Sequence, residues 1–169
     1  MVGEARDSET SQIAVRAALT GHLIFTTLHA GDSCSAVFRM IEMGVEPYLL
    51  ASTLKGVVAQ RLVRKLCPHC KNFLSEENIY KPVGCDKCGG TGYFGRIALH
   101  EILRADKNIR AMILNSKDLD KIRGVALEGG LQTLAADGLK KVREGLTTLE
   151  EVRQILGAEF FHSQISDSR

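Results

Sequence analysis

The sequence contains no long run of apolar residues. The longest candidate, YLLASTLKGVVAQRLV, is interrupted by Lys55, Gln60 and Arg61, whereas a membrane-spanning helix needs about 20 predominantly apolar residues. The first residues, MVGEARD, also lack the basic segment followed by an apolar one that is typical of a secretory signal. These absences favour a cytoplasmic location, where thiols stay reduced and clustered cysteines are first interpreted as metal ligands.

Charge of one sign is not in excess either. The 169 residues include 22 Lys and Arg against 20 Asp and Glu. This balance gives no whole-chain argument for nucleic acid or an acidic membrane as a partner. The length is enough for one domain, or one domain with a small appendage, and for a sizeable core.

The order of apolar and turn residues predicts an α/β fold. Residues 7–21 are expected to form a helix capped by Asp7 and stopped at Gly21. Residues 22–29, HLIFTTLH, predict a buried strand, and residues 33–44 a second helix. A further helix is predicted from Pro47, with apolar residues at three- or four-residue steps: Leu50, Leu54, Val57, Val58 and Leu62.

The composition changes along the chain and suggests four consecutive ranges. Residues 1–66 carry the α/β pattern, and residues 67–95, rich in cysteine and glycine, form a small insertion. Residues 96–157 are expected to be mainly helical after a first strand, RIALHEIL, with Thr147 and Glu150 at the spacing of a capping box. Residues 158–169 are polar and predict a flexible tail.

Two C-x2-C pairs, CPHC and CDKC, are the strongest chemical signal. Cys67 and Cys70 can approach a metal ion from one turn while Cys85 and Cys88 approach it from another. Four thiolates in tetrahedral geometry favour a structural zinc ion, because no coordination position is left open for a substrate. Redox-active or incidental cysteines remain the alternatives. Cys34 stands apart and is expected to pack beside an apolar helix face.

Two further patterns are ambiguous. GTGYFG, residues 90–95, matches G-x-G-x-x-G but follows a cysteine pair rather than a strand, so we interpret its glycines as turns of the insertion. The run RLVRKLCPHCK places Arg61, Arg64, Lys65 and Lys71 close together. This run is compatible with binding to nucleic acid or to a phosphate, but a solvated helix face is the preferred interpretation.

Glu4 lies where an apolar lead-in, MVG, runs out into a loop. This is the usual place for chemistry in open α/β sheets, where a carboxylate can hold the water that attacks a γ-phosphate or act through Mg²⁺. A solvated glutamate is the simpler interpretation of these residues alone. His22 and His29 bracket the predicted strand and can either contact a phosphate or cap a strand end.

The amino-acid sequence of residues 1–156 resembles that of a known family. It resembles, in continuous order, the C-terminal ATPase domain of the secretion NTPases of type II secretion and type IV pilus assembly. The segments that carry the resemblance are VGEARDSETSQIAVRAALTGHLIFTTLHAGDSCSAVFRMIEMGVEPYLLASTLKGVVAQRLVRKLCPHC, CDKCGGTGYFGRIALHEIL and ADGLKKVREGLTTLEEV. The resemblance implies part of a RecA-like P-loop NTPase core in residues 1–66, with the tetracysteine insertion and a C-terminal helical subdomain after it.

The resemblance also implies roles for individual residues. VGEARD is similar to the end of the Walker B motif, with Glu4 as the catalytic carboxylate and Arg6 beside it. TGHLIFTTLHAGDS is similar to the His box, which places His22 and His29 where they sense the γ-phosphate. The four cysteines match the zinc motif of the assembly and export branch, which retraction relatives generally lack.

The chain also departs from the family pattern. The phosphate-binding loop, G-x-x-x-x-G-K-[ST], and the Asp box do not occur in it, nor do the N-terminal regulatory domain and the upstream arginines. We therefore expect the C-terminal part of a longer protein, in which ATP and Mg²⁺ bind. Without the loop, most electrostatic binding of the triphosphate is lost, so the isolated chain is expected to have negligible ATPase activity.

The full-length relatives imply partners and leave two other interpretations. They are understood as homo-hexameric rings that act on an inner-membrane platform protein to assemble or export pilin-like subunits, at the cytoplasmic side of the membrane. A zinc-stabilised interaction module that docks on the ring or the platform without hydrolysing ATP is the alternative. A zinc-ribbon nucleic-acid binder is weaker, and no specific nucleic acid is expected.

Overall fold

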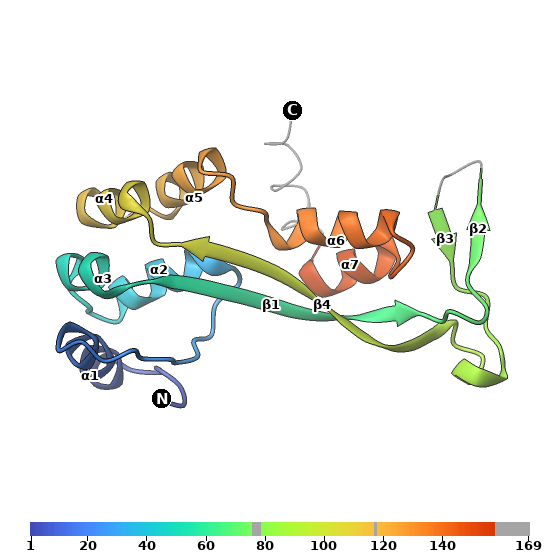
Figure 1. Cartoon of the computed structure of the whole chain (residues 1–169), viewed down its shortest axis with the longest axis horizontal. Helices are drawn as coiled ribbons and strands as arrows, with labels where there is room; N and C mark the ends of the chain where they lie inside the picture. Colours follow the sequence, from blue (N-terminus) through green and yellow to red (C-terminus); the bar gives the residue numbers. More distant parts are fainter. Residues whose placement is uncertain (76–78, 117, 158–169) are drawn as a thin grey trace. The chain divides into compact units, whose positions relative to one another are not determined.

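The computed structural model describes residues 1–75, 79–116 and 118–157, which divide into two compact units. Among the described residues, the first combines 1–59 with 102–131, and the second combines 60–101 with 132–157. Strands β1 (Gly56–Leu66) and β4 (Tyr93–Arg104) pair with each other and contribute residues to both units. Their arrows run in opposite directions (Figure 1). The four ranges predicted from the sequence were defined by motifs, whereas these two units are defined by compactness. The four ranges therefore stay predictions.

Five helices form the first unit: α1 (Ser8–Leu19), α2 (Ser33–Glu42), α3 (Pro47–Thr53), α4 (Lys107–Asn115) and α5 (Leu119–Glu128). Aspartates cap four of them, because a side-chain carboxylate satisfies backbone N–H groups that have no partner within the helix. Asp7, as predicted, accepts a hydrogen bond from the Thr10 backbone N–H at 2.8 Å.

The core of this unit is apolar and draws on all five helices and on β4. Cys34 lies in it as predicted. The buried residues of this cluster are Val15, Cys34, Val37, Val45, Leu50, Ala51, Leu103, Ile109, Ile113, Ile122 and Ala126. Helices from before residue 60 and after residue 105 thus share one core, so the first unit needs both segments of the chain.

The buried strand predicted at residues 22–29 is wrong in both respects. Only an isolated parallel bridge joins Thr27 to Glu4, supported by hydrogen bonds from the backbone N–H of Val2 to Phe25 O and of Ala5 to Thr27 O. Leu23 and Phe25 are 68% and 65% exposed. A strand is defined by its neighbours, and in the described part of the chain only residues 2–5 lie beside this segment.

The helix predicted from Pro47 through Leu62 is also corrected. It ends at Thr53, and strand β1 begins at Gly56. Gly56 approaches β4 so closely that a Cβ there would lie 2.9 Å from Leu103 O. Arg110 accounts for the helix end: its guanidinium donates to the carbonyl oxygens of Ala51, Ser52 and Leu54, which have no partners within the helix.

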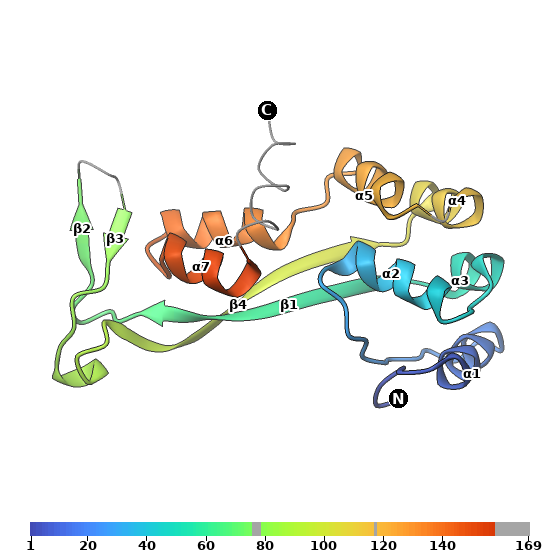
Figure 2. The ribbon, with the colours of Figure 1, turned by 180° about the vertical axis from the view of Figure 1, so that it is seen from behind.

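The second unit contains β2 (Asn72–Leu74), β3 (Ile79–Lys81), the one-turn helix η1 (Asp86–Cys88), and helices α6 (Leu134–Arg143) and α7 (Leu149–Leu156), with the remaining residues of β1 and β4 (Figure 2). β2 and β3 pair antiparallel, with Phe73 opposite Tyr80. α6 and α7 pack closely, since a Cβ on Gly138 would lie 2.7 Å from Val152 Cγ1.

Contacts join the β2–β3 hairpin to the turn between α6 and α7. Lys71 Nζ donates to Gly145 O at 2.8 Å, and the Leu66 backbone N–H donates to Leu146 O at 2.9 Å. Gly145 has φ +64°, and a Cβ there would lie 2.4 Å from the ring of Tyr80. Glycine is therefore required at this position for both the backbone and the ring.

Predictions for the C-terminal half are partly confirmed. The strand RIALHEIL is confirmed within β4, which begins earlier, at Tyr93. The cap of α7 is Thr148 rather than Thr147, and Thr148 Oγ1 accepts from the Glu151 N–H. Thr147 instead donates its hydroxyl to Arg64 O. The predicted tail, residues 158–169, lies outside the described residues, and among the described helices none is long and apolar enough to cross a membrane.

Candidate functional site

Three of the predicted site residues meet where residues 2–5 lie beside residues 25–27. Glu4 is at the parallel bridge, with its Oε2 2.7 Å from an Arg6 terminal nitrogen. Its Oε1 lies 2.8 Å from Nε2 of His29. The pairing of the two segments thus brings together side chains that lie 25 positions apart in the sequence.

The carboxyl of Glu4 is held in its ionised form. A hydrogen bond from Arg6 is the main cause that lowers the pKa of Glu4 below its ordinary value, with the charge of Arg6 acting in the same direction and partial burial opposing it. Oε1 is buried, and none of the described residues donates an aligned hydrogen bond to it, although His29 is close. This oxygen can accept a hydrogen bond from a donor such as water, or interact with a cation.

A cavity of about 430 Å³ opens beside these groups. Its lining residues are Glu4, Ala5, Arg6, Leu28, His29, Arg39 and Met43. Arg39, on α2, was missed by the sequence analysis, because within its helix it forms an ordinary surface pair with Glu42 at 3.2 Å. Only the fold shows that a second arginine shares the cavity with Arg6.

His22 does not join this group in the part of the chain that the structure describes. Its Nδ1 lies 3.0 Å from Thr20 Oγ1, just after the end of α1, and the residue is exposed. It does not line the cavity. The two histidines of the predicted His box are therefore separated within this chain.

The four cysteines come together as the sequence predicted. Their sulfur atoms all lie within 4.8 Å of one another. The Sγ atoms of Cys67 and Cys85 are 4.0 Å apart, and Cys88 Sγ is 3.9 Å from both Cys70 Sγ and Cys85 Sγ. A tetrahedral zinc ion with Zn–S bonds of about 2.3 Å requires S···S separations of about 3.8 Å. The group thus fits a tetrahedral metal ion.

Backbone N–H groups point at the cysteine sulfurs. Gly84 donates to Cys70 Sγ at 3.3 Å, and Cys85 and Gly92 each donate to Cys88 Sγ at 3.2 Å. Burial acts in the opposite direction, but these two donors lower the pKa of Cys88 to about 6. Burial raises the pKa of Cys70 to about 11 in the metal-free chain. Such donors stabilise thiolates and orient them toward a shared ion.

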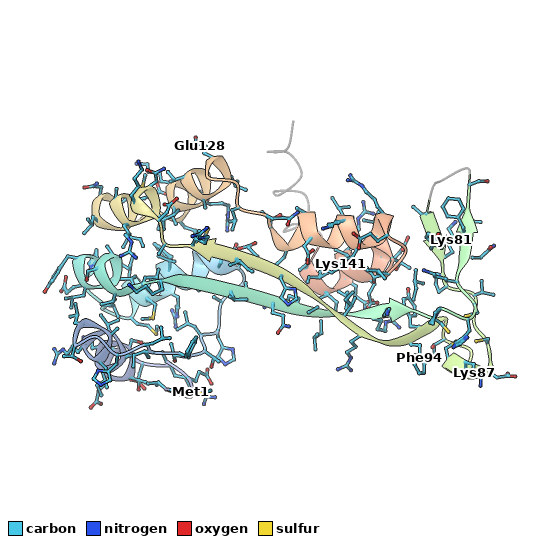
Figure 3. The ribbon with its side chains drawn as sticks, in the orientation of Figure 1. Met1, Lys81, Lys87, Phe94, Glu128 and Lys141 are labelled. Atoms are coloured by element: carbon cyan, nitrogen blue, oxygen red, sulfur yellow. The ribbon has the colours of Figure 1, made fainter. Side chains whose placement is uncertain are left out.

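The glycines after the cysteines serve this loop, as predicted. Gly90 and Gly92 have φ +78° and +76°, and strand β4 rather than a helix follows them. A Cβ on Gly92 would lie 2.4 Å from Pro82 Cβ. Figure 3 shows Lys87, which lies in η1 between two of the cysteines, and Phe94 on β4 beyond these turns. The G-x-G-x-x-G match is therefore part of the cysteine module and not a dinucleotide fingerprint.

The basic run lies on strand β1 and in the following turn, so its interpretation as a helix face is wrong. Arg64 forms a two-nitrogen contact with Glu151, with its Nε at 2.8 Å and a terminal nitrogen at 2.6 Å from Oε2. The same guanidinium lies 4.3 Å from the ring centroid of Tyr93. Lys71 is engaged by Gly145 O. Arg61 donates to Gln60 O at 2.9 Å. Three of the four cations thus make internal contacts.

Comparison with known protein families places the chain in one of them. A family model described as "Type II/IV secretion system protein" matches residues 1–154. The chain belongs to the type II/IV secretion system protein family. The family resemblance found in the sequence is thereby confirmed.

Curated relatives in this secretion family are much longer than the chain. The type IV pilus assembly ATPase PilB of Thermus thermophilus is 49% identical, over 90% of this chain and 19% of PilB. The type II secretion system protein HxcR of Pseudomonas aeruginosa is 46% identical, over 92% of this chain and 33% of HxcR. The chain therefore spans only about a fifth to a third of these relatives (19% and 33%).

Solved structures of a pilus retraction motor and of an ATPase share the fold. The pilus retraction motor PilT, solved with bound ADP, has a TM-score of 0.66 and 27% identity, over 90% of this chain and 37% of PilT. The ATPase DotB of Legionella pneumophila has a TM-score of 0.63 and 22% identity, over 90% of this chain and 36% of DotB, and shows the fold alone. The predicted fold class, part of an α/β NTPase core with a tetracysteine group, is confirmed.

Proposed function

We propose that this chain supplies the hydrolytic part of the ATP site of a secretion or pilus-assembly motor ATPase. The observation that carries the proposal is the meeting of Glu4, Arg6 and His29 at one cavity. An ionised carboxylate whose Oε1 lies near His29 but receives no aligned hydrogen bond from the described residues suits the orientation of an attacking water. Membership of a family whose relatives include named ATPases supports the same conclusion.

Each residue of the site has a distinct task in this proposal. Glu4 Oε1 accepts a hydrogen bond from the attacking water and orients it, while Arg6 keeps the carboxyl ionised. His29 lies 2.8 Å from the same oxygen, so its position can report whether a γ-phosphate is present. When bound, Mg²⁺ neutralises charge that develops on the phosphate oxygens. His22, exposed beside Thr20, is proposed to meet the nucleotide only in the whole protein.

The phosphate-binding half of the site must come from elsewhere. No G-x-x-x-x-G-K-[ST] sequence occurs in the 169 residues, so we propose that the isolated chain does not turn over ATP. In the longer protein the function is to couple hydrolysis to assembly or export of pilin-like subunits. The proposed setting is a homo-hexamer at the cytoplasmic face of the inner membrane, in contact with a membrane platform protein.

The tetracysteine site is proposed to hold a structural zinc ion. Three Sγ pairs at 3.9–4.0 Å, all four sulfurs within 4.8 Å of one another, and the N–H donors at the sulfurs support this choice. Because four thiolates leave no open position, the ion takes no part in hydrolysis. The same module, joined to α6 and α7, supports a second candidate function, a zinc-stabilised interaction module without ATPase activity.

A hybrid enzyme tests the proposal. Residues 1–154 would replace the matched segment of Thermus PilB, whose remaining length is expected to supply the phosphate-binding loop. We expect ATP turnover by the hybrid and a loss of at least about 100-fold on Glu4→Gln, since a positioned base contributes about 10²–10⁴-fold.

Glu9→Gln is the matched control, because Glu9 is an exposed glutamate on α1. Its turnover should equal that of the parent hybrid. A folded, zinc-loaded hybrid whose turnover is the same with Glu4→Gln would rule out the hydrolytic role. The second candidate function, a zinc-stabilised interaction module without ATPase activity, would then be preferred.

A further inference from the structure

An ion pair between the buried Asp32 and the partly buried Arg123 connects α5 to the start of α2. The carboxylate of Asp32 is 2% exposed, and its Oδ2 lies 2.7 Å from a terminal nitrogen of Arg123. Its Oδ1 accepts the Ser35 backbone N–H at 2.6 Å and so caps α2. Arg123 is 91 positions away in the sequence, and it also lies 3.7 Å from the exposed Asp120.

Asp32 stands three residues after His29, with Ala30 and Gly31 between them. Three consecutive Cα steps span at most about 11 Å, so a shift at Asp32 is passed on to His29 over a short segment. The side chain of His29 is 88% exposed and has little packing to hold it. Its position against Glu4 therefore depends mainly on the backbone of residues 29–32.

We propose that Arg123 is a positioning residue for the Glu4–His29 pair and acts through Asp32. Because Asp32 is buried, its charge requires a partner, and Arg123 is the cation that provides it. This fixes residues 29–32 and thereby the imidazole of His29 against Glu4. A role of this coupling in nucleotide sensing rests on the proposed function. The positioning of His29 by Arg123 and Asp32 does not depend on that function.

Loss of Arg123 has a defined physical consequence. A buried carboxylate without its partner must be solvated, and the shortest way is for the segment around Asp32 to move toward water. Such a movement loosens His29 from Glu4. A purely structural role of Arg123 would instead loosen α5 and its buried residues Ile122 and Ala126, and would leave His29 in place.

The test is NMR of the histidine side chains in the purified chain, without nucleotide. Imidazole signals of His22 and His29 would be assigned with His22→Gln and His29→Gln, and then recorded in Arg123→Leu, Arg123→Lys and Asp32→Asn. Lys121→Leu is the matched control, because Lys121 is an exposed cation on the same helix. Asp32→Asn keeps an acceptor for the cap of α2 but removes the buried charge.

We expect the His29 signal to shift in Arg123→Leu, less in Arg123→Lys, and not in Lys121→Leu. Amide exchange of residues 29–32 should rise about tenfold in Arg123→Leu, while the His22 signal stays in place. In the Asp32→Asn background, Arg123→Leu should add no further change, because the charge that needs Arg123 is gone.

An unchanged His29 signal in folded Arg123→Leu, or equal effects in the two Asp32 backgrounds, would overturn the proposal. If Arg123→Leu does not fold, the same comparison of His29 signals can be made with Arg123→Lys, in the wild-type chain and in Asp32→Asn. Failure of the hybrid to hydrolyse ATP would instead refute the proposed function, and it would leave these NMR results unaffected.

Discussion

Glu151 is a single buried carboxylate that joins α7 to strand β1. It accepts the backbone N–H of Arg64 at 3.0 Å and two guanidinium nitrogens of the same residue. The residue is 4% exposed, whereas Arg64 is 51% exposed. Burial alone would raise the pKa of Glu151, but the Arg64 hydrogen bonds and charge outweigh it and lower the pKa below its ordinary 4.5.

The pair therefore predicts an acid sensitivity. A folded-state pKa below the unfolded value contributes stability that is fully present above about 4.5 and is lost as pH falls through the folded pKa. Glu151→Gln should lower the free energy of unfolding at neutral pH by about 1–2 kcal/mol, at the low end for a charged pair because Arg64 is half exposed. Urea unfolding at a series of pH values checks this.

The neighbouring Glu150→Gln is the control, since Glu150 is exposed and does not contact Arg64 in the described structure. Below about pH 4.5 the wild-type chain should lose stability toward that of Glu151→Gln, and the two curves should converge. Parallel curves over the whole range would show that the Arg64 pair does not govern this dependence.

Individual residues were predictable where local chemistry decides their place. Asp7 as a cap and the cysteine pairs follow from spacing alone. Arg39 and the partnership of Arg64 with Glu151 were not, because each depends on segments that meet only in the fold. Thr147 and Thr148 are equally good caps by type, and the contact of Thr147 with Arg64 O selects Thr148.

At the scale of elements, the cysteine module and helices α6 and α7 form one connected structure. Lys71 follows directly after Cys70 and donates to Gly145 O, and the Cys67 backbone N–H donates to Gly92 O. The module's loops have little apolar core of their own, so a bound metal ion would supply much of their stability. Its loss should therefore reach the α6–α7 turn.

Metal removal tests this connection. We expect about one zinc ion per chain, lost in Cys88→Ser and after chelation, together with faster amide exchange in residues 64–71 and 144–151. Cys34→Ala is the control, because it removes a thiol in the other unit and should leave the zinc content unchanged. Unchanged exchange at residues 144–151 in the metal-free chain would contradict the connection.

The elements that the sequence predicted wrongly share one cause. Residues 22–29 have the composition of a buried strand, but a strand also needs neighbours, and Leu23 and Phe25 stay exposed in this chain. After Pro47, apolar residues recur at helical spacing beyond Thr53. The helix nevertheless ends at Thr53, because Arg110 caps its last carbonyl groups and strand β1 begins at Gly56. Pairing and capping by distant residues overrode the local pattern.

At the scale of the whole molecule, the chain consists of two units, each assembled from two separate segments. The sequence indicated the α/β class and the family, because motif order is a linear property. It did not indicate that residues 102–131 complete the core of the unit that contains Glu4, because that core depends on long-range packing.

The most direct measurement is Mg²⁺-dependent ATP binding and turnover by the purified, zinc-loaded chain, beside the same chain with Glu4→Gln. Glu4 and His29 are present in this chain, but no phosphate-binding loop occurs in its residues. We therefore predict no turnover above that of Glu4→Gln and no tight binding of ATP. Turnover that disappears in Glu4→Gln would contradict it, because phosphate would then be held without a P-loop.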